Sequence, residues 1–278
     1  MFRVILALAT VVLVSNPNVS GESRSIKGPD GTLHVDVRGA GGVPVVFLPS
    51  LAGTTGQWEP QLVHLAPTRQ VVAVDLRGHG RSDPPKRAAY APGDYAQDVK
   101  AVLDALNLRQ AVVVGHSMGS AAALAFAAAN PSRVKALLLV DPVDDPLKRP
   151  PNPGFDKYLA RLEGADYPKL IEAYWTQILK EATPATSARV MADMKATPQQ
   201  TVVQSMRALT RFDSSGALTA FKGPVLSVTT PMNDFPSSLH NVHPSLRHQR
   251  VTGVSHWLHL DRPKEFNTIL DAFLEKVR

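Results

Sequence analysis

Short, continuous apolar runs recur along the chain, with helix-like segments between them. A strand with one solvent-facing side alternates apolar and polar residues, whereas a strand buried on both faces of a parallel sheet is apolar throughout. These runs therefore favour a central parallel sheet. The continuous runs are VPVVFL (43–48), QVVAVD (70–75), AVVVG (111–115), ALLLVD (136–141) and GPVLSVT (223–229). Two further candidates are the alternating run TLHVDV (32–37) and the weaker RHQRVTG (247–253).

Helical periodicity fills the intervals between these runs. In residues 94–108 and again in residues 263–277, the apolar side chains recur at the spacing of one helical face. Pro263 falls in the first turn of the second segment, where proline is tolerated. Strand–helix alternation of this kind predicts a three-layer α/β fold with right-handed crossovers.

One long segment interrupts this alternation. No buried-strand run occurs between residues 142 and 221, where the proline-dense stretch PVDDPLKRPPNPG is followed by helical patterns. We therefore expect a helical cap at residues 142–221, inserted over the strand ends. Residues 22–141 and 222–278 would then form the α/β core.

The N-terminal segment has the pattern of a secretory signal. Arg3 precedes an almost wholly apolar run from Val4 to Val14, and a polar stretch follows. A bilayer-spanning helix needs about 20 apolar residues, and this run is shorter. We expect a signal peptide at residues 1–21 and a secreted or periplasmic protein, without stable membrane insertion after cleavage. An uncleaved apolar anchor helix is the alternative.

Composition excludes several classes of function. Lys and Arg number 30 against 24 Asp and Glu, and this modest excess is scattered, so we expect no nucleic-acid partner. The chain has no cysteine, which excludes disulfides, thiolate metal sites and a cysteine nucleophile. HNVH (240–243) lacks a carboxylate-rich partner motif, and GAGG (39–42) is followed by a strand instead of a helix. We therefore expect no metal and no cofactor.

Residues 115–119 read GHSMG, an instance of G-x-S-x-G between a β-branched strand and an alanine-rich helix. In this motif the strand-to-helix turn is so tight that the serine backbone is strained. Bulky residues two positions away would collide, so glycine stands on both sides of Ser117. The turn exposes the Ser117 hydroxyl above the sheet edge, beside the unpaired N–H groups that begin the helix.

Two further stretches strengthen this reading. VVAVDLRGHGRSDPP (71–85) and GVSHWLHLDRPKEFNTILDAFL (253–274), together with GHSMG, resemble segments of the α/β-hydrolases. Within that family the chain is most similar to the capped group of small esterases, lactonases and C–C bond hydrolases, from about Ile26 to the C-terminus. The resemblance implies a mostly parallel eight-stranded sheet with helices on both faces and a helical cap after the sixth strand.

A serine hydroxyl needs a base and a group that orients the base. In this fold those groups follow the serine in the order acid, then histidine. The resemblance points to His256 as the base, with His259 as its rival. It points to Asp234, just past the run that ends at Thr229, as the acid, with Asp141 as the alternative.

The oxyanion that forms during attack needs two N–H donors. Met118, directly after the serine, supplies one. By position in the family pattern Leu51 supplies the other, although this chain has Pro49-Ser50 where the family usually has His-Gly. The Ser50 hydroxyl either adds a hydrogen bond or caps the turn.

The sequence therefore predicts a serine hydrolase that cleaves a carboxylic ester or related acyl bond of a small molecule through an acyl-enzyme. A receptor-like homologue that binds a small molecule and turns it over slowly is the first alternative. A cofactor-free haloperoxidase or perhydrolase is the second, although those relatives place proline where this chain has Ala52.

Overall fold

The computed structural model describes residues 21–277, and its centre is an eight-stranded sheet in the order β1-β2-β4-β3-β5-β6-β7-β8. Strands β1 and β2 form an antiparallel hairpin, β2 also pairs antiparallel with β4, and all later pairs are parallel. The expected mostly parallel sheet is confirmed. The strands are β1 (Glu22–Gly28), β2 (Gly31–Arg38), β3 (Val45–Leu48), β4 (Val71–Val74), β5 (Ala111–His116), β6 (Val134–Val140), β7 (Val225–Thr229) and β8 (Arg247–Arg250).

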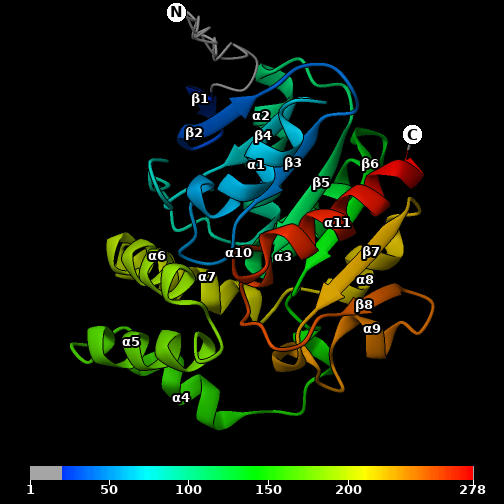
Figure 1. The fold of residues 1–278 in the computed structure, drawn as a ribbon. Coiled ribbons are helices and arrows are strands. Elements are labelled where there is room, and N and C mark those ends of the chain that lie inside the picture. The colour runs from blue at the N-terminus through cyan, green and yellow to red at the C-terminus, as the bar shows by residue number, and fades with distance from the viewer. Residues whose placement is uncertain (1–20, 278) are drawn as a thin grey trace, which may run out of the picture.

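Helices cover both faces of this sheet (Figure 1). Side chains alternate between the faces along each strand. In β3, Val46 and Leu48 join the cluster packed under α2, α3 and α8, while Val45 and Phe47 join the cluster under α1 and α11. The predicted three-layer α/β fold is thus confirmed. The α-helices are α1 (Glu59–Leu65), α2 (Pro92–Ala105), α3 (Met118–Ala129), α4 (Pro153–Arg161), α5 (Tyr167–Ile178), α6 (Pro184–Ala196), α7 (Gln199–Leu209), α8 (Ser214–Ala220), α9 (Leu239–Val242), α10 (Leu258–Asp261) and α11 (Pro263–Leu274).

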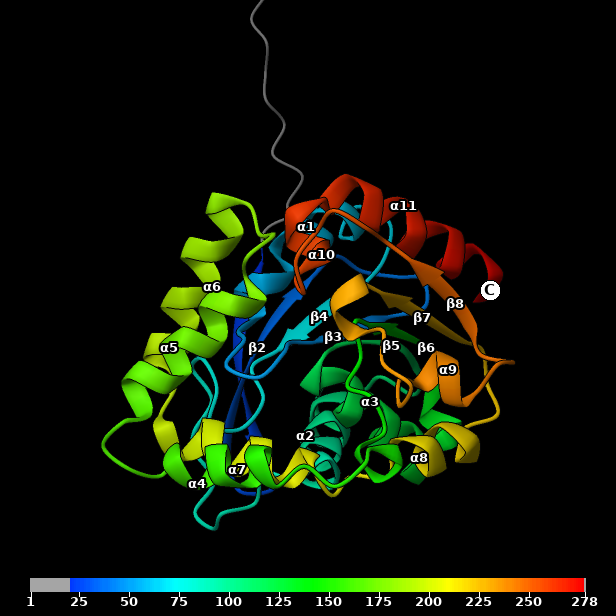
Figure 2. The same ribbon diagram turned by 90° about the horizontal axis from the view of Figure 1, so that it is seen from below.

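Between β6 and β7 the chain leaves the sheet and forms helices α4 to α8. Helices α4 to α7 gather on one side of the molecule, next to the loops that follow β3 and β4 (Figure 2). They have an apolar cluster of their own, to which the core contributes Ala52 and Trp257. Helix α8 differs, because its Ala217 and Leu218 pack in the cluster of α2 and α3. We call the segment from α4 to α7, residues 153–209, the helical insertion.

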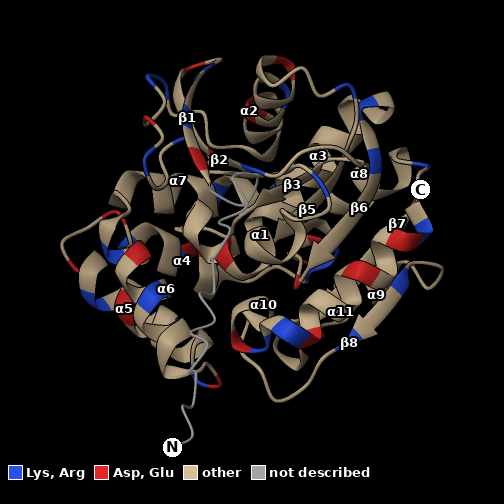
Figure 3. Ribbon diagram, turned by 45° about the horizontal axis from the view of Figure 1, so that its top comes forward, with Lys and Arg blue, Asp and Glu red and all other residues tan. Residues whose placement is uncertain are grey.

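Basic and acidic residues both occur along α5, α6 and α11 (Figure 3). Residues 1–20 lie outside the described part of the chain, and the predicted signal peptide falls almost entirely there. None of the helices in residues 21–277 has both the length and the apolar content that crossing a bilayer requires.

Candidate active site

Ser117 lies at the turn between the end of β5 and the start of α3. Its backbone has φ 51° and ψ −115°, a conformation that costs energy for a residue with a side chain. The turn is held on both sides. The Ser117 N–H donates to the carbonyl oxygen of Val140 in β6 at 3.0 Å, and the Ser120 N–H donates to the carbonyl oxygen of Ser117 at 2.9 Å. Hydrogen bonds to the neighbouring strand and to its own helix therefore stabilise the strained backbone of Ser117.

The two glycines of the motif are required by the space around them. A Cβ atom on Gly115 would overlap the carbonyl oxygen of Gly119, and a Cβ atom on Gly119 would overlap the carbonyl oxygens of Leu48 and Pro49. All these obstacles are backbone atoms, which cannot turn aside as a flexible side chain can. The absence of a side chain at Gly119 also lets the first turn of α3 approach the end of β3. The start of α3 and the loop after β3 are thus brought together.

His256 and Asp141 form a buried pair at the carboxyl ends of the strands, where the Ser117 turn also lies. Asp141 directly follows β6 and is fully buried, with a positive φ of 40°. Its Oδ2 lies 2.6 Å from His256 Nδ1. Because a carboxylate only accepts, Nδ1 carries the hydrogen of this bond and Nε2 is left free to accept a proton.

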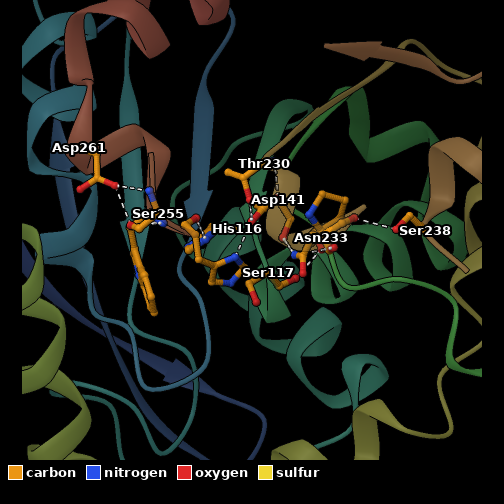
Figure 4. A network of polar contacts seen from close by, with 12 residues as sticks. His116, Ser117, Asp141, Thr230, Asn233, Ser238, Ser255 and Asp261 are labelled. Carbon is orange, nitrogen blue, oxygen red and sulfur yellow. Dashed lines mark hydrogen bonds and ion pairs between the residues drawn. The ribbon is translucent and has the colours of Figure 1, made fainter. Parts of the chain in front are cut away.

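The carboxylate of Asp141 is itself held by Thr230, which follows β7. The Thr230 N–H donates to Oδ1 at 2.7 Å, and its hydroxyl donates to Oδ2 at 2.9 Å. The amide of Asn233 donates to the backbone oxygen of Asp141 at 3.1 Å. Figure 4 shows this network running from Thr230 and Asn233 through Asp141 towards Ser117. Sequence reasoning missed Thr230 and Asn233, because neither belongs to a recognisable motif.

Asp234 does not contact His256, and the expectation that it orients this histidine is corrected in favour of Asp141. A 3-10 turn at Pro231–Asn233 carries Asp234 beyond the strand end. There its carboxylate lies 2.8 Å from Arg250 and 3.1 Å from His240, and accepts from Asn241 at 3.0 Å. The hydrogen bonds from Asn241 and His240 lower the pKa of Asp234. The residue that orients His256 is instead Asp141, directly after β6.

Two other histidines lie behind His256 in the interior. His116 Nε2 is 2.9 Å from the backbone oxygen of His256, and the two rings are 4.5 Å apart. His259, the rival candidate for the base, stacks on Trp58 at 4.2 Å. Burial lowers the pKa of His116 far below its usual range and that of His259 to about 3, so both rings are neutral near pH 7. Of the three, only His256 lines the cavity into which Ser117 opens.

The candidate oxyanion donors lie on two segments that face each other. Met118 is the first residue of α3, so its N–H has no acceptor within the helix. Ser50 and Leu51 line the same cavity as Ser117. Their loop turns sharply, with a hydrogen bond of 2.9 Å from the Gly53 N–H to the Ser50 carbonyl and with Ala52 at φ 57°. The Ser50 hydroxyl points to Gln57 Oε1 at 3.3 Å.

The cavity above Ser117 has a volume of about 930 Å³ and lies between the core and the helical insertion. Ser50, Ser117 and His256 line it, and most of the lining surface is apolar. Its other polar and charged lining residues are Asp144, Lys148, Arg149, Asn152, Asp156, Thr210, Asn233 and Ser237. The apolar and aromatic lining residues include Leu51, Val143, Phe155, Tyr174, Trp175, Ile178, Met206, Leu209, Met232, Phe235 and Trp257. Within residues 21–277 no group of three or more His, Asp or Glu side chains could hold a metal ion.

Comparisons with known proteins agree with this fold. Residues 43–263 match a family model described as the alpha/beta hydrolase fold. The protein named "Putative carbamate hydrolase RutD" from Variovorax paradoxus (strain S110) is 33% identical over 210 residues, covering 73% of this chain and 78% of the relative. The 3-oxoadipate enol-lactonase 1 of Acinetobacter baylyi (strain ATCC 33305 / BD413 / ADP1) is 24% identical over 89% of this chain and 94% of its own. The solved structure of Est816, an N-acyl homoserine lactone degrading enzyme, is 27% identical with a TM-score of 0.75, covering 90% of this chain and all of that one.

Proposed function

The chain belongs to the α/β-hydrolase fold family, and on that basis we propose that it is a serine hydrolase that cleaves a carboxylic ester or related acyl bond. The observation that carries the proposal is the strained turn that presents Ser117 to the same cavity as His256, whose ring is bonded to the buried Asp141. A nucleophile, a base and an orienting acid are the three groups that acyl transfer to a hydroxyl requires.

The roles of these groups follow from their chemistry. His256 Nε2 takes the proton as Ser117 Oγ attacks the substrate carbonyl, and Asp141 stabilises the imidazolium that forms. The N–H groups of Met118 and Leu51 stabilise the negative charge on the carbonyl oxygen. The alcohol leaves with the proton from His256. Water, activated by the same histidine, then releases the acid and restores the serine.

The walls of the cavity support a substrate with a sizeable apolar part. A volume of about 930 Å³ is large for a short-chain ester and lies at the upper end of the range for small-molecule sites. The relatives include enzymes named for a carbamate, an enol-lactone and an N-acyl homoserine lactone, all of which contain an acyl bond to oxygen or nitrogen. We infer that the helical insertion acts as the cap that selects among such substrates.

The test is multiple-turnover hydrolysis of p-nitrophenyl esters from acetate to decanoate. Ser117→Ala is expected to lose at least a thousandfold in kcat and to keep the circular dichroism spectrum of the parent protein, because it removes the nucleophile and little volume. A Ser117→Ala protein that retained the parent rate would refute the proposal. A single burst of product from the parent protein, without further turnover, would favour a receptor-like homologue instead.

Export remains a proposal that rests on the apolar run from Val4 to Val14. Expression of the full chain in a bacterial host, followed by fractionation and mass spectrometry, tests it. A mature protein that begins near residue 22 in the periplasm or medium would support export. A full-length protein in the cytoplasm would contradict it.

A further inference from the structure

Gln57 connects three parts of the molecule. It lies in the 3-10 helix Thr55–Trp58, directly after the loop that carries Ser50 and Leu51, and is 1% exposed. Its Oε1 accepts from Trp257 Nε1 at 3.2 Å and from the Ser50 hydroxyl at 3.3 Å. Its Nε2 donates to Asp193 Oδ2 at 2.8 Å. Because Asp193 belongs to α6, the Gln57 amide joins three parts of the molecule. They are the loop 49–54, which we call the oxyanion loop, Trp257 next to His256, and the helical insertion.

The partners of Gln57 allow its amide only one orientation. The indole N–H of Trp257 can only donate, and the carboxylate of Asp193 accepts. If the amide of Gln57 were reversed, a donor would face a donor at Trp257 and an acceptor would face an acceptor at Asp193. The mismatch at Trp257 would be buried and that at Asp193 partly buried, and an unpaired polar group is costly in such places. The amide is therefore fixed at both ends.

The oxyanion loop is shaped around this amide. A Cβ atom on Gly53 would lie 2.7 Å from Gln57 Oε1, so the loop passes directly over the oxygen. Thr54, in the same loop, donates from its hydroxyl to Asp193 Oδ2 at 3.2 Å. Asp193 thus holds the loop in two ways, directly through Thr54 and indirectly through Gln57. Neither Gln57 nor Asp193 lines the cavity above Ser117.

We propose that Gln57 and Asp193 are positioning residues, which hold the Ser50–Leu51 loop and Trp257 in place and couple the geometry of the oxyanion donors to the docking of helix α6. The inference rests on the serine-hydrolase function proposed above. The effect reaches the reaction through the Leu51 N–H on one side and through Trp257, next to His256, on the other. The oxyanion exists only during the reaction, so a displaced donor lowers kcat more than it changes KM.

Gln57→Met tests this directly, because methionine keeps the length and volume of the side chain and removes both ends of the amide. With p-nitrophenyl acetate we expect kcat to fall about tenfold while KM stays within about twofold, the change that a loss of one to two hydrogen bonds produces. Asp193→Ala is expected to give a similar fall. Asp193→Asn keeps an acceptor for Gln57 Nε2 and should restore most of the rate.

The double variant tests whether the effects of Gln57 and Asp193 on kcat are coupled. If Asp193 acts in part through Gln57, the loss in kcat of Gln57→Met with Asp193→Ala is smaller than the product of the two single losses, and what it loses beyond Gln57→Met alone reports the direct bond from Thr54 to Asp193. A double variant whose kcat falls by the full product of the two single losses would contradict the inference. A rise in KM for long-chain esters with kcat unchanged would also contradict it, because that result would indicate a contact with substrate. Should Gln57→Met fail to fold, the comparison of Asp193→Ala with Asp193→Asn decides, because Asp193 is only partly buried.

Gln61→Met is the matched control. Gln61 is another fully buried glutamine, but its amide donates to the backbone oxygen of His259 at 3.2 Å and to Asn267 at 3.0 Å, away from the insertion. We expect it to lower the melting temperature without a comparable fall in kcat. Ser117→Ala in the same assay separates the two proposals. An active Ser117→Ala rejects the serine-hydrolase function, whereas an inactive Ser117→Ala beside a fully active Gln57→Met rejects only the role of Gln57.

Discussion

At the scale of single residues, Asp141 and Asp234 form a natural pair for one experiment. Asp141 is buried against His256 Nδ1 at 2.6 Å, whereas Asp234 lies in a partly exposed group with Arg250 and His240. Asp141→Asn replaces a carboxylate that accepts at both oxygens by a neutral amide that accepts at one position only and cannot stabilise the imidazolium by charge, and we expect kcat to fall by about 10³- to 10⁴-fold. Asp234→Asn is expected to keep kcat within about twofold. Steady-state kinetics on one p-nitrophenyl ester measures both, and the reverse ranking would restore Asp234 as the acid.

The sequence could predict Ser117 and His256 as candidates because each has distinctive immediate neighbours. Glycines two residues away constrain the serine, and GVSHW identifies the histidine within a recognisable loop. The acid has no such local signal, since Asp141 and Asp234 both follow buried strands. The choice between them depends on where the chain goes after β7, and the 3-10 turn at Pro231–Asn233 is not readable from residue types alone. The roles of Leu51 and Met118 as oxyanion donors stay predictions.

At the scale of elements, the approach of α3 to β3 is the packing on which the site depends. Gly119 and Gly93 are both the second residue of a helix, α3 and α2. A Cβ atom on Gly119 would overlap backbone oxygens of the loop after β3, whereas one on Gly93 would meet nothing within 4 Å. Gly119→Ala should therefore cost about 1–3 kcal/mol of stability by overpacking, and should lower kcat because it moves the Met118 donor.

Gly93→Ala is the control at the same helix position. It is expected to be neutral or to stabilise the protein by up to about 1 kcal/mol, because alanine favours helix and no atom must move. Denaturant unfolding and ester hydrolysis are measured on both variants. A Gly119→Ala protein as stable and active as Gly93→Ala would show that the contact between α3 and β3 is looser than the structure indicates.

The elements that the sequence predicted well are those with buried faces. Strands β3 to β7 were visible as apolar runs because both of their faces are covered. Of the edge strands, β1 was not predicted, because it has one buried residue, Ile26. Strand β8 was only the weaker candidate at 247–253, because all four of its residues are exposed. Hydrogen bonding to a neighbouring strand holds them, and pairing of that kind leaves no hydropathy pattern.

At the scale of the whole molecule, buried neutral histidines make stability depend on pH. Burial lowers the pKa of His79 to about 4 and that of His259 to about 3, and it places the pKa of His116 far below the ordinary value of 6.5. In the unfolded chain all three would take up a proton near pH 6.5. Buried acids act in the opposite sense, since burial raises the pKa of Asp98 and of Asp193.

The sign of the expected change follows from proton uptake. Below pH 6.5 the unfolded state binds protons that the folded state excludes, so stability is fully present above pH 6.5 and is lost as the pH falls towards 4. At pH 5 His79 and His259 each contribute a loss of about 2 kcal/mol relative to pH 7, His116 changes stability in the same direction, and the buried acids reduce the sum. Urea unfolding at pH 7, 6 and 5 measures the slope. His79→Gln is expected to flatten it, because the variant removes one of the buried rings that take up a proton only on unfolding. Stability that stayed constant from pH 7 to pH 5, or a slope that His79→Gln did not change, would mean that water reaches the rings that the fold places in its interior.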